Sequence, residues 1–83
     1  METIVTGWNK FHGTWFARAY ATRPDVIAGP YGFVFAESDI SAADAIDRVT
    51  AAALAEARKY DSAPRDVVHR GRVSRVMFDN WKF

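Results

Sequence analysis

The side chains able to carry out chemistry in this chain are two histidines, ten acidic residues and eleven basic residues, with no cysteine. Nucleophilic catalysis needs a serine or cysteine beside a base and an orienting group. His12 lies in a predicted turn and His69 in a basic segment, and no catalytic motif surrounds either of them. We therefore interpret both as surface histidines and predict that the protein is not an enzyme.

Metal and cofactor sites are not predicted either. No pair of histidines or carboxylates falls at ligand spacing on one helix face together with a third ligand. Asp44 and Asp47 are three residues apart, but the dipole of a helix that begins there already accounts for them. The five glycines are scattered and form no phosphate-binding loop. We predict no metal and no cofactor.

The charges are unevenly distributed, although the formal net charge is only +1. Residues 37–47 hold four acids and no base, whereas residues 58–75 hold six bases and two acids. Helix-dipole complementarity and solubility explain much of this pattern. The alternative is a basic surface that meets an anionic partner, and its candidate arginines are Arg65, Arg70, Arg72 and Arg75.

The element that must position these residues is a long helix predicted over residues 41–60, SAADAIDRVTAAALAEARKY. Ser41 is a favourable N-cap, and Asp44 stands three residues later, as in a capping box. Ile40 precedes the cap at the position of a hydrophobic staple. Alanine, the best helix former, dominates the segment. One face carries side chains at spacings of three and four: Ile46, Val49, Ala53, Ala57 and Tyr60.

Three strands are predicted before the helix, over residues 2–8, 14–22 and 31–36. Residues 9–13 form the first turn, in which Asn9 and Gly13 can adopt left-handed conformations. Alternation in the second strand places Trp15 and three alanines on one face, which leaves room for a helix to approach closely. Alternation in the third strand places Tyr31, Phe33 and Phe35 on one face.

The segment after the helix permits more than one interpretation. Pro64 ends the helix, and the β-branched residues that follow favour a hairpin with its turn at Arg70-Gly71. A single strand or a second helix beginning at Pro64 are the alternatives. The tail, with Trp81 and Phe83, is expected to dock on the domain.

These elements predict one α+β domain spanning residues 1–83. A small antiparallel sheet carries one long alanine-rich helix packed across it, in the order βββα followed by a C-terminal strand or hairpin. Phe35→Ala should then lower the free energy of unfolding by about 3–5 kcal/mol. The predicted core comprises Ile4, Trp15, Phe33, Phe35, Ile46, Val49, Ala53, Val76 and Phe78.

The segment Tyr31-Gly32-Phe33-Val34 resembles the core of the RNP1 strand of RNA-recognition motifs, in which strand aromatics stack on bases. The resemblance implies that Tyr31 and Phe33 could form such a platform. The resemblance covers about a dozen positions. The helix that follows Glu37-Ser38 also lies where the family's second helix would. Gly29-Pro30 replaces the family's basic residue and glycine, and only two strands are predicted upstream. We therefore interpret both aromatics as core residues.

The chain has more aromatic residues than one small core readily buries: three tryptophans, three tyrosines and six phenylalanines. Because tryptophan, tyrosine and arginine are common interface anchors, we predict a partner surface that includes Trp8, Phe11 and Tyr20, with Trp81 as a further exposed aromatic. No signal peptide or membrane span is recognised, so a soluble cytoplasmic protein is expected.

In general make-up the chain is similar to the small inhibitors that phages encode against bacterial CRISPR defence, which are short, combine strands with a helix and lack catalytic motifs. The similarity implies a non-enzymatic module that covers a functional surface of a larger protein or ribonucleoprotein complex. That class shares no common fold, so it assigns no residues here. The alternative is a small nucleic-acid-binding domain that uses the arginine-rich segment and sheet aromatics. A homodimer through an exposed strand edge is compatible with both.

Overall fold

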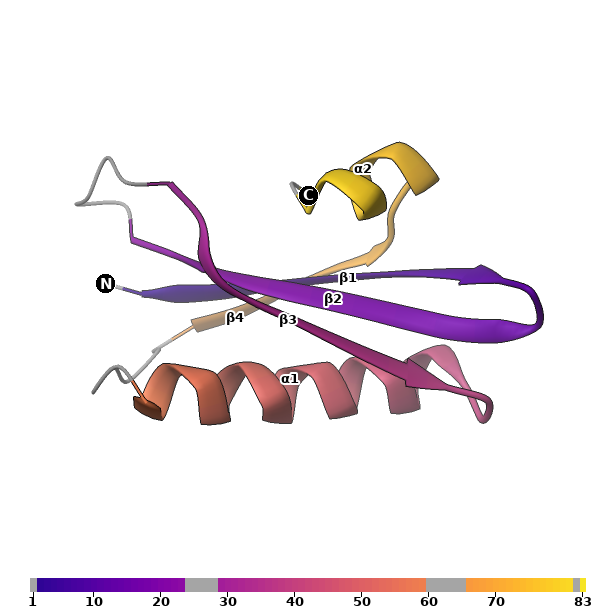
Figure 1. Cartoon of the computed structure of the whole chain (residues 1–83), viewed down its shortest axis with the longest axis horizontal. Helices are drawn as coiled ribbons and strands as arrows, with labels where there is room; N and C mark the ends of the chain where they lie inside the picture. The colour runs from indigo at the N-terminus through magenta and orange to yellow at the C-terminus, as the bar shows by residue number, and fades with distance from the viewer. Residues whose placement is uncertain (1, 24–28, 60–65, 82) are drawn as a thin grey trace.

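The computed structural model describes residues 2–23, 29–59, 66–81 and 83, and it confirms the predicted α+β fold. A four-stranded sheet in the order β3-β2-β1-β4 has helix α1 along one face and the short helix α2 on the other (Figure 1). The elements are β1 (Thr3–Phe11), β2 (Thr14–Thr22), β3 (Tyr31–Ser38), α1 (Ala42–Lys59), β4 (Asp66–Arg72) and α2 (Arg75–Asn80).

The first three strands form the predicted antiparallel meander. β1 is longer than expected, and it continues through Asn9 to Phe11. His12 and Gly13 alone make the turn, with φ of 54° and 74°, as a two-residue hairpin loop with left-handed central residues requires. Asn9 was wrongly placed in this turn; it is a buried strand residue whose side-chain amide donates to the carbonyl of Val73 at 2.9 Å.

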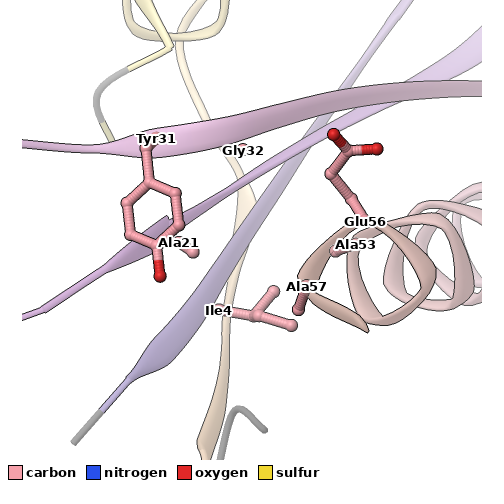
Figure 2. A pocket seen from close by; sticks show the side chains of 7 residues that line it. All are labelled: Ile4, Ala21, Tyr31, Gly32, Ala53, Glu56 and Ala57. Carbon is pink, nitrogen blue, oxygen red and sulfur yellow. The ribbon is translucent and has the colours of Figure 1, made fainter. Parts of the chain in front are cut away.

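A register shift in β3 changes the direction of its first aromatic side chain. The pairing of β2 with β3 is irregular between Ala19 and Ala21, and Gly32 has a φ of 65°. Tyr31 therefore lies beside Ala21 on the α1 side of the sheet, as Figure 2 shows, whereas Phe33 lies on the opposite side, 5.1 Å from the Trp81 ring. The prediction that Tyr31, Phe33 and Phe35 share a face was wrong for Tyr31.

Helix α1 begins as the sequence predicts. The hydroxyl of Ser41 accepts from the backbone N–H of Asp44 at 3.0 Å. The Asp44 carboxylate does not complete a capping box; it accepts from the Ser38 hydroxyl at 2.6 Å and pairs with Arg48 at 2.8 Å. Ile40 is 67% exposed and is not a buried staple.

The face between α1 and the sheet is closed by small residues. Ala45, Val49 and Ala53 recur every fourth position on the helix and are buried against Ala17 and Ala19 of β2, with Ile4 of β1 beside them. This arrangement confirms the predicted close approach between an alanine-rich helix and an alanine-rich strand, since neither surface projects a long side chain. The tryptophans of β1 and β2, Trp8 and Trp15, pack at the margin of this cluster.

The segment after α1 forms one strand and one short helix, so the preferred hairpin was wrong and the single-strand alternative is confirmed. β4 pairs with β1 in parallel, because α1 carries the chain back across the sheet before β4 begins, so the sheet is mixed rather than wholly antiparallel as predicted. Gly71, with φ of 73°, lies where the register with β1 shifts rather than in a hairpin turn. Ser74 then caps α2 by accepting from Met77 N–H at 3.2 Å. Tyr60, Pro64 and Arg65 lie outside the described residues.

The predicted core is confirmed in part. Ile4, Val49, Ala53 and Phe78 are buried, and Trp15 and Ile46 pack against the core cluster. Three predicted core residues are exposed: Phe33, Phe35 and Val76.

Candidate functional site

The sheet face opposite α1 carries most of the large aromatic side chains. We call this surface the aromatic face. β1, β2 and β3 contribute side chains to it, and α2 with the C-terminal residues covers part of it (Figure 1). Its members are Phe11, Phe16, Arg18, Tyr20, Phe33, Phe35, Phe78, Trp81 and Phe83.

Hydrogen bonds from β1 fix the position of α2 on this face. The backbone N–H of Val73 donates to the Trp8 carbonyl at 3.0 Å, and the Asn9 amide donates to the carbonyl of Val73 at 2.9 Å. Phe78 then points inward from α2 and is only 1% exposed, with its ring 6.0 Å from that of Phe11. The buried ring and the two bonds together anchor α2 over β1.

The end of the chain is anchored through Tyr20. Its hydroxyl donates to the carbonyl oxygen of Phe83 at 3.0 Å and accepts from the N–H of the same residue at 3.2 Å. The Phe83 ring lies over Gly7, where a Cβ atom would meet that ring at 3.0 Å. Glycine at this position therefore lets the terminal aromatic seat on β1, and the predicted docking of the tail is confirmed for Trp81 and Phe83.

Arg18 lies at the centre of the aromatic face. Its guanidinium carbon is 4.2 Å from the centroid of Trp81 and 4.6 Å from that of Phe78, so both rings meet the cation. Its Nη1 donates to the carbonyl of Phe78 at 3.0 Å, at the C-terminal end of α2. Burial lowers the pKa of Arg18, an effect that the carboxylate of Asp79 opposes. The group remains a cation at neutral pH, because arginine titrates far above it.

Trp81 adopts a left-handed conformation, with φ of 59°, immediately after α2. Such a conformation is unusual for a bulky side chain and costs about 1–3 kcal/mol. Stacking on Arg18 and an edge-on contact with Phe33, with centroids 5.1 Å apart, hold the indole in place. The strain is therefore sustained by contacts of the aromatic face itself.

The β3 side of the aromatic face remains open. Phe33 is 48% exposed and Phe35 is 46% exposed, because α2 packs over β1 and does not extend across β3. Phe33, Asn80 and Trp81 line an open notch between the strand and the end of α2. We call Phe33, Phe35 and Trp81 the docking patch. The sequence does reveal the alternation that puts Phe33 and Phe35 on one face, but it assigns them to the core.

The aromatic residues predicted to bind a partner lie on both faces of the sheet and differ in exposure. Tyr20 is 6% exposed and clamps the chain terminus, so its predicted exposure was wrong. Trp8 is half-buried on the α1 side, and Phe11 is half-buried on the aromatic face. The structure therefore separates Trp8 from Phe11 by the thickness of the sheet.

The predicted arginines also separate. Arg72 stacks over Trp8 at 5.7 Å on the α1 side, whereas Arg75 stacks over Phe11 at 4.0 Å on the aromatic face and pairs with Asp79 at 3.2 Å. Arg70 is exposed on β4, and Arg65 lies outside the described residues. Described arginines thus flank the sheet on both sides rather than forming one basic surface.

The two histidines lie in different surroundings. His69 Nδ1 is 2.6 Å from the hydroxyl of Thr6 across β4 and β1, and His12 is exposed in the first turn. Among the residues with described positions, no three histidine or acidic side chains gather where a metal ion could bind. Over the same ranges, no helix combines the length and apolar character needed to cross a membrane.

A small cavity lies at the C-terminal end of α1, between the helix and the sheet (Figure 2). Apolar atoms dominate its lining, and Tyr31 and Glu56 flank its entrance. Its volume of about 10 Å³ accommodates at most one water molecule, so it is not a substrate pocket.

Comparisons with protein-family models, with curated proteins and with solved structures find no significant match to this chain.

Proposed function

We propose that the protein is a non-enzymatic protein-binding module whose partner contacts the docking patch of Phe33, Phe35 and Trp81. The observation that carries the proposal is the exposure of two neighbouring phenylalanines, 48% and 46%, beside the stacked pair of Arg18 and Trp81. Contiguous exposed aromatic surface is uncommon on a small soluble domain and is typical of interfaces.

The geometry favours a partner that presents an apolar side chain. The notch beside Phe33 and Trp81 is open, and aromatic rings form its walls. Trp81 is already ordered by Arg18, so a ligand that enters the notch orders few additional side chains. A leucine, methionine or aromatic residue projecting from a protein surface is the expected anchor.

A protein partner is favoured over nucleic acid by the placement of the aromatics and cations. A stacking platform for bases needs neighbouring exposed rings and basic side chains on one surface. Tyr31 and Phe33, the two aromatics of the RNP1-like segment, lie on opposite faces of the sheet. Arg72 and Arg75 are likewise on opposite faces, and the guanidinium of Arg18 is occupied by Trp81 and Phe78.

Inhibition of a larger host complex, such as a CRISPR effector, is a specific form of this proposal. A module without catalytic groups would inhibit by covering a functional surface of its target. The prediction is that the protein blocks target binding or cleavage by a sensitive effector, and that Phe33→Ser/Phe35→Ser does not block it. If the wild-type protein inhibits no effector in a panel, inhibition of CRISPR effectors is rejected, whereas binding to another protein partner is not.

The proposal is tested by capture with matched variants. Tagged wild-type protein, Phe33→Ser/Phe35→Ser and Ile40→Ser are each incubated with a bacterial lysate, with and without nuclease. Ile40 is the control because it is a large apolar residue, 67% exposed, that precedes α1 and is not part of the aromatic face. We expect a stoichiometric protein that survives nuclease, is retained by Ile40→Ser and is lost with the double variant.

Two outcomes would contradict the proposal. Equal retention of the protein by both variants would show that the docking patch is not the contact. Retention that disappears with nuclease, together with an affinity that falls steeply with salt, would instead support the nucleic-acid alternative through the arginines. Thermal unfolding of each variant is measured alongside, so that loss of binding is not confused with loss of the fold.

A further inference from the structure

The two edges of the sheet differ in how well they are protected. β3 forms one edge, and its pairing is interrupted by the register shift near Gly32, while α1 packs closely against it. β4 forms the other edge, and its only irregularity lies at its C-terminal end, beyond His69. Regular, uncovered edge strands offer backbone groups for pairing with another strand.

No helix among the described residues covers either face of β4. Residues Asp66 to Arg70 are all exposed, and neither α1 nor α2 packs substantially against the strand. At its centre are two exposed valines: Val67 is 38% exposed and Val68 is 41% exposed. The strand contains no proline and no lysine, the residues that most often protect an edge.

We propose that β4 pairs antiparallel with β4 of a second copy of this chain, about a two-fold axis that passes beside Val68 perpendicular to the sheet. In this register Val68 faces Val68 of the second copy. Asp66 of each copy faces Arg70 of the other, so the interface contains this charge pair twice. Alternation along the strand places these three positions on the same sheet face. Opposite charges and β-branched residues directly across two strands are favourable pairs.

The sequence of β4 selects this register. A two-fold antiparallel pairing must be centred on one residue, because the axis relates each residue to the partner opposite it. Centring the axis on Val67 would place Val68 opposite Asp66, and centring it on His69 would place Val68 opposite Arg70. Either shift places Val68 opposite a charge, whereas the Val68 register pairs Val68 with Val68 and Asp66 with Arg70, and its remaining pair is Val67 opposite His69.

The proposed dimer joins two four-stranded sheets into one continuous sheet. An axis perpendicular to the sheet keeps both copies of α1 on one face and both aromatic faces on the other. The two docking patches would therefore point in the same direction, which favours a partner that is itself repeated or symmetric. The pairing does not use Phe33, Phe35 or Trp81, so a test of the dimer is independent of a test of the proposed function.

A cysteine substitution tests the register directly, because the native chain contains no cysteine. In the proposed pairing the two Val68 Cα atoms lie about 4.5–5.5 Å apart, within the range of a disulfide. The two Val67 Cα atoms are diagonal neighbours at about 7–8 Å, too far for easy bonding. Under mild oxidation we expect the Val68→Cys variant to form a reducible covalent dimer. Its rate of cross-linking should be at least about tenfold higher than that of the Val67→Cys variant.

Charge exchange tests the cross-strand pairs. Because one added strand gives a small interface, we expect the wild-type protein to dimerise with a dissociation constant of about 10–500 µM in sedimentation experiments. Asp66→Arg and Arg70→Asp should each weaken dimerisation about tenfold by placing like charges opposite each other. The double variant Asp66→Arg/Arg70→Asp restores opposite charges and should regain wild-type association.

The proposal fails if the wild-type protein sediments as the 9.3 kDa monomer up to about 1 mM. It also fails if Val67→Cys and Val68→Cys cross-link equally, or if the double charge variant associates no better than the single variants. Unchanged thermal unfolding of the variants confirms that each monomer is folded.

Discussion

The two faces of the sheet are built from different side chains and are covered to different extents. On the α1 side, alanine and valine from the helix meet alanine from β2, and the contact is closed. On the aromatic face, large rings from three strands meet a short helix, and the β3 portion stays open. Small residues allow two elements to approach until water is excluded, whereas large rings need a cover as wide as the sheet.

Under the proposed function, this difference assigns stability to one face of the sheet and partner binding to part of the other. On the α1 side, the residues that join the helix to the sheet are buried and stabilise the fold. The aromatic face contributes most to stability where α2 and the chain terminus cover it, at Phe78 and Tyr20. Where the cover ends, the same kind of side chain stays exposed, at Phe33 and Phe35, and these are the residues proposed to contact a partner. Substitutions on each face test this division.

Phe78→Ala should have the largest effect on stability. Phe78 is 1% exposed and joins α2 to β1 through the aromatic face. Removing its ring should lower the free energy of unfolding by about 3–5 kcal/mol, as measured by chemical denaturation. A loss below about 1 kcal/mol would show that α2 is not part of the cooperative fold, and the aromatic face would then be open along its whole length.

Ala53→Leu tests the closed face. Ala53 is 6% exposed between α1 and the sheet, so the added carbons must displace neighbours and should lower stability by about 1–3 kcal/mol. Ala55→Leu is the matched control, because Ala55 is exposed on the same helix and its replacement should change stability by less than about 0.5 kcal/mol. Equal effects at the two positions would contradict the close packing described for α1.

Phe35→Ala should have the smallest effect of the three. About half of this side chain remains in water in the folded state, so its removal should lower the free energy of unfolding by about 1–2 kcal/mol rather than the 3–5 kcal/mol expected of a buried phenylalanine. The loss of partner binding should be much larger than the loss of stability. A stability loss as large as that of Phe78→Ala would place Phe35 in the core and remove the docking patch.

The sequence predicts the α1 side of the molecule well. Local signals are sufficient there: Ser41 caps the helix, alanine favours it, and the strand over residues 14–22 has the bounds observed for β2. The packing of the helix on the alanine-rich strand face follows from the size of those side chains. The hairpin turn is misplaced by a few residues because Asn9 has turn propensity but is held in β1 by its bond to Val73.

The aromatic face is less predictable because it depends on long-range contacts. The β-branched residues of β4 favour a strand but do not indicate that it pairs with β1, and Gly71 suits a register shift as well as a turn. Alternation groups Tyr31 with Phe33, and only the irregular pairing near Gly32 separates them. Phe78 is buried as predicted, whereas the exposure of Phe35 follows from the length of α2, which composition does not determine.

The most direct test of this account is the solvent exposure of individual phenylalanines. The six phenylalanines are labelled with fluorine, the resonances are assigned by single substitutions, and a soluble paramagnetic agent is added while the fluorine relaxation is measured. The account predicts strong relaxation enhancement at Phe33 and Phe35 and protection at Phe78. Protection of all three would contradict it, because the aromatic face would then be closed and the docking patch would not exist.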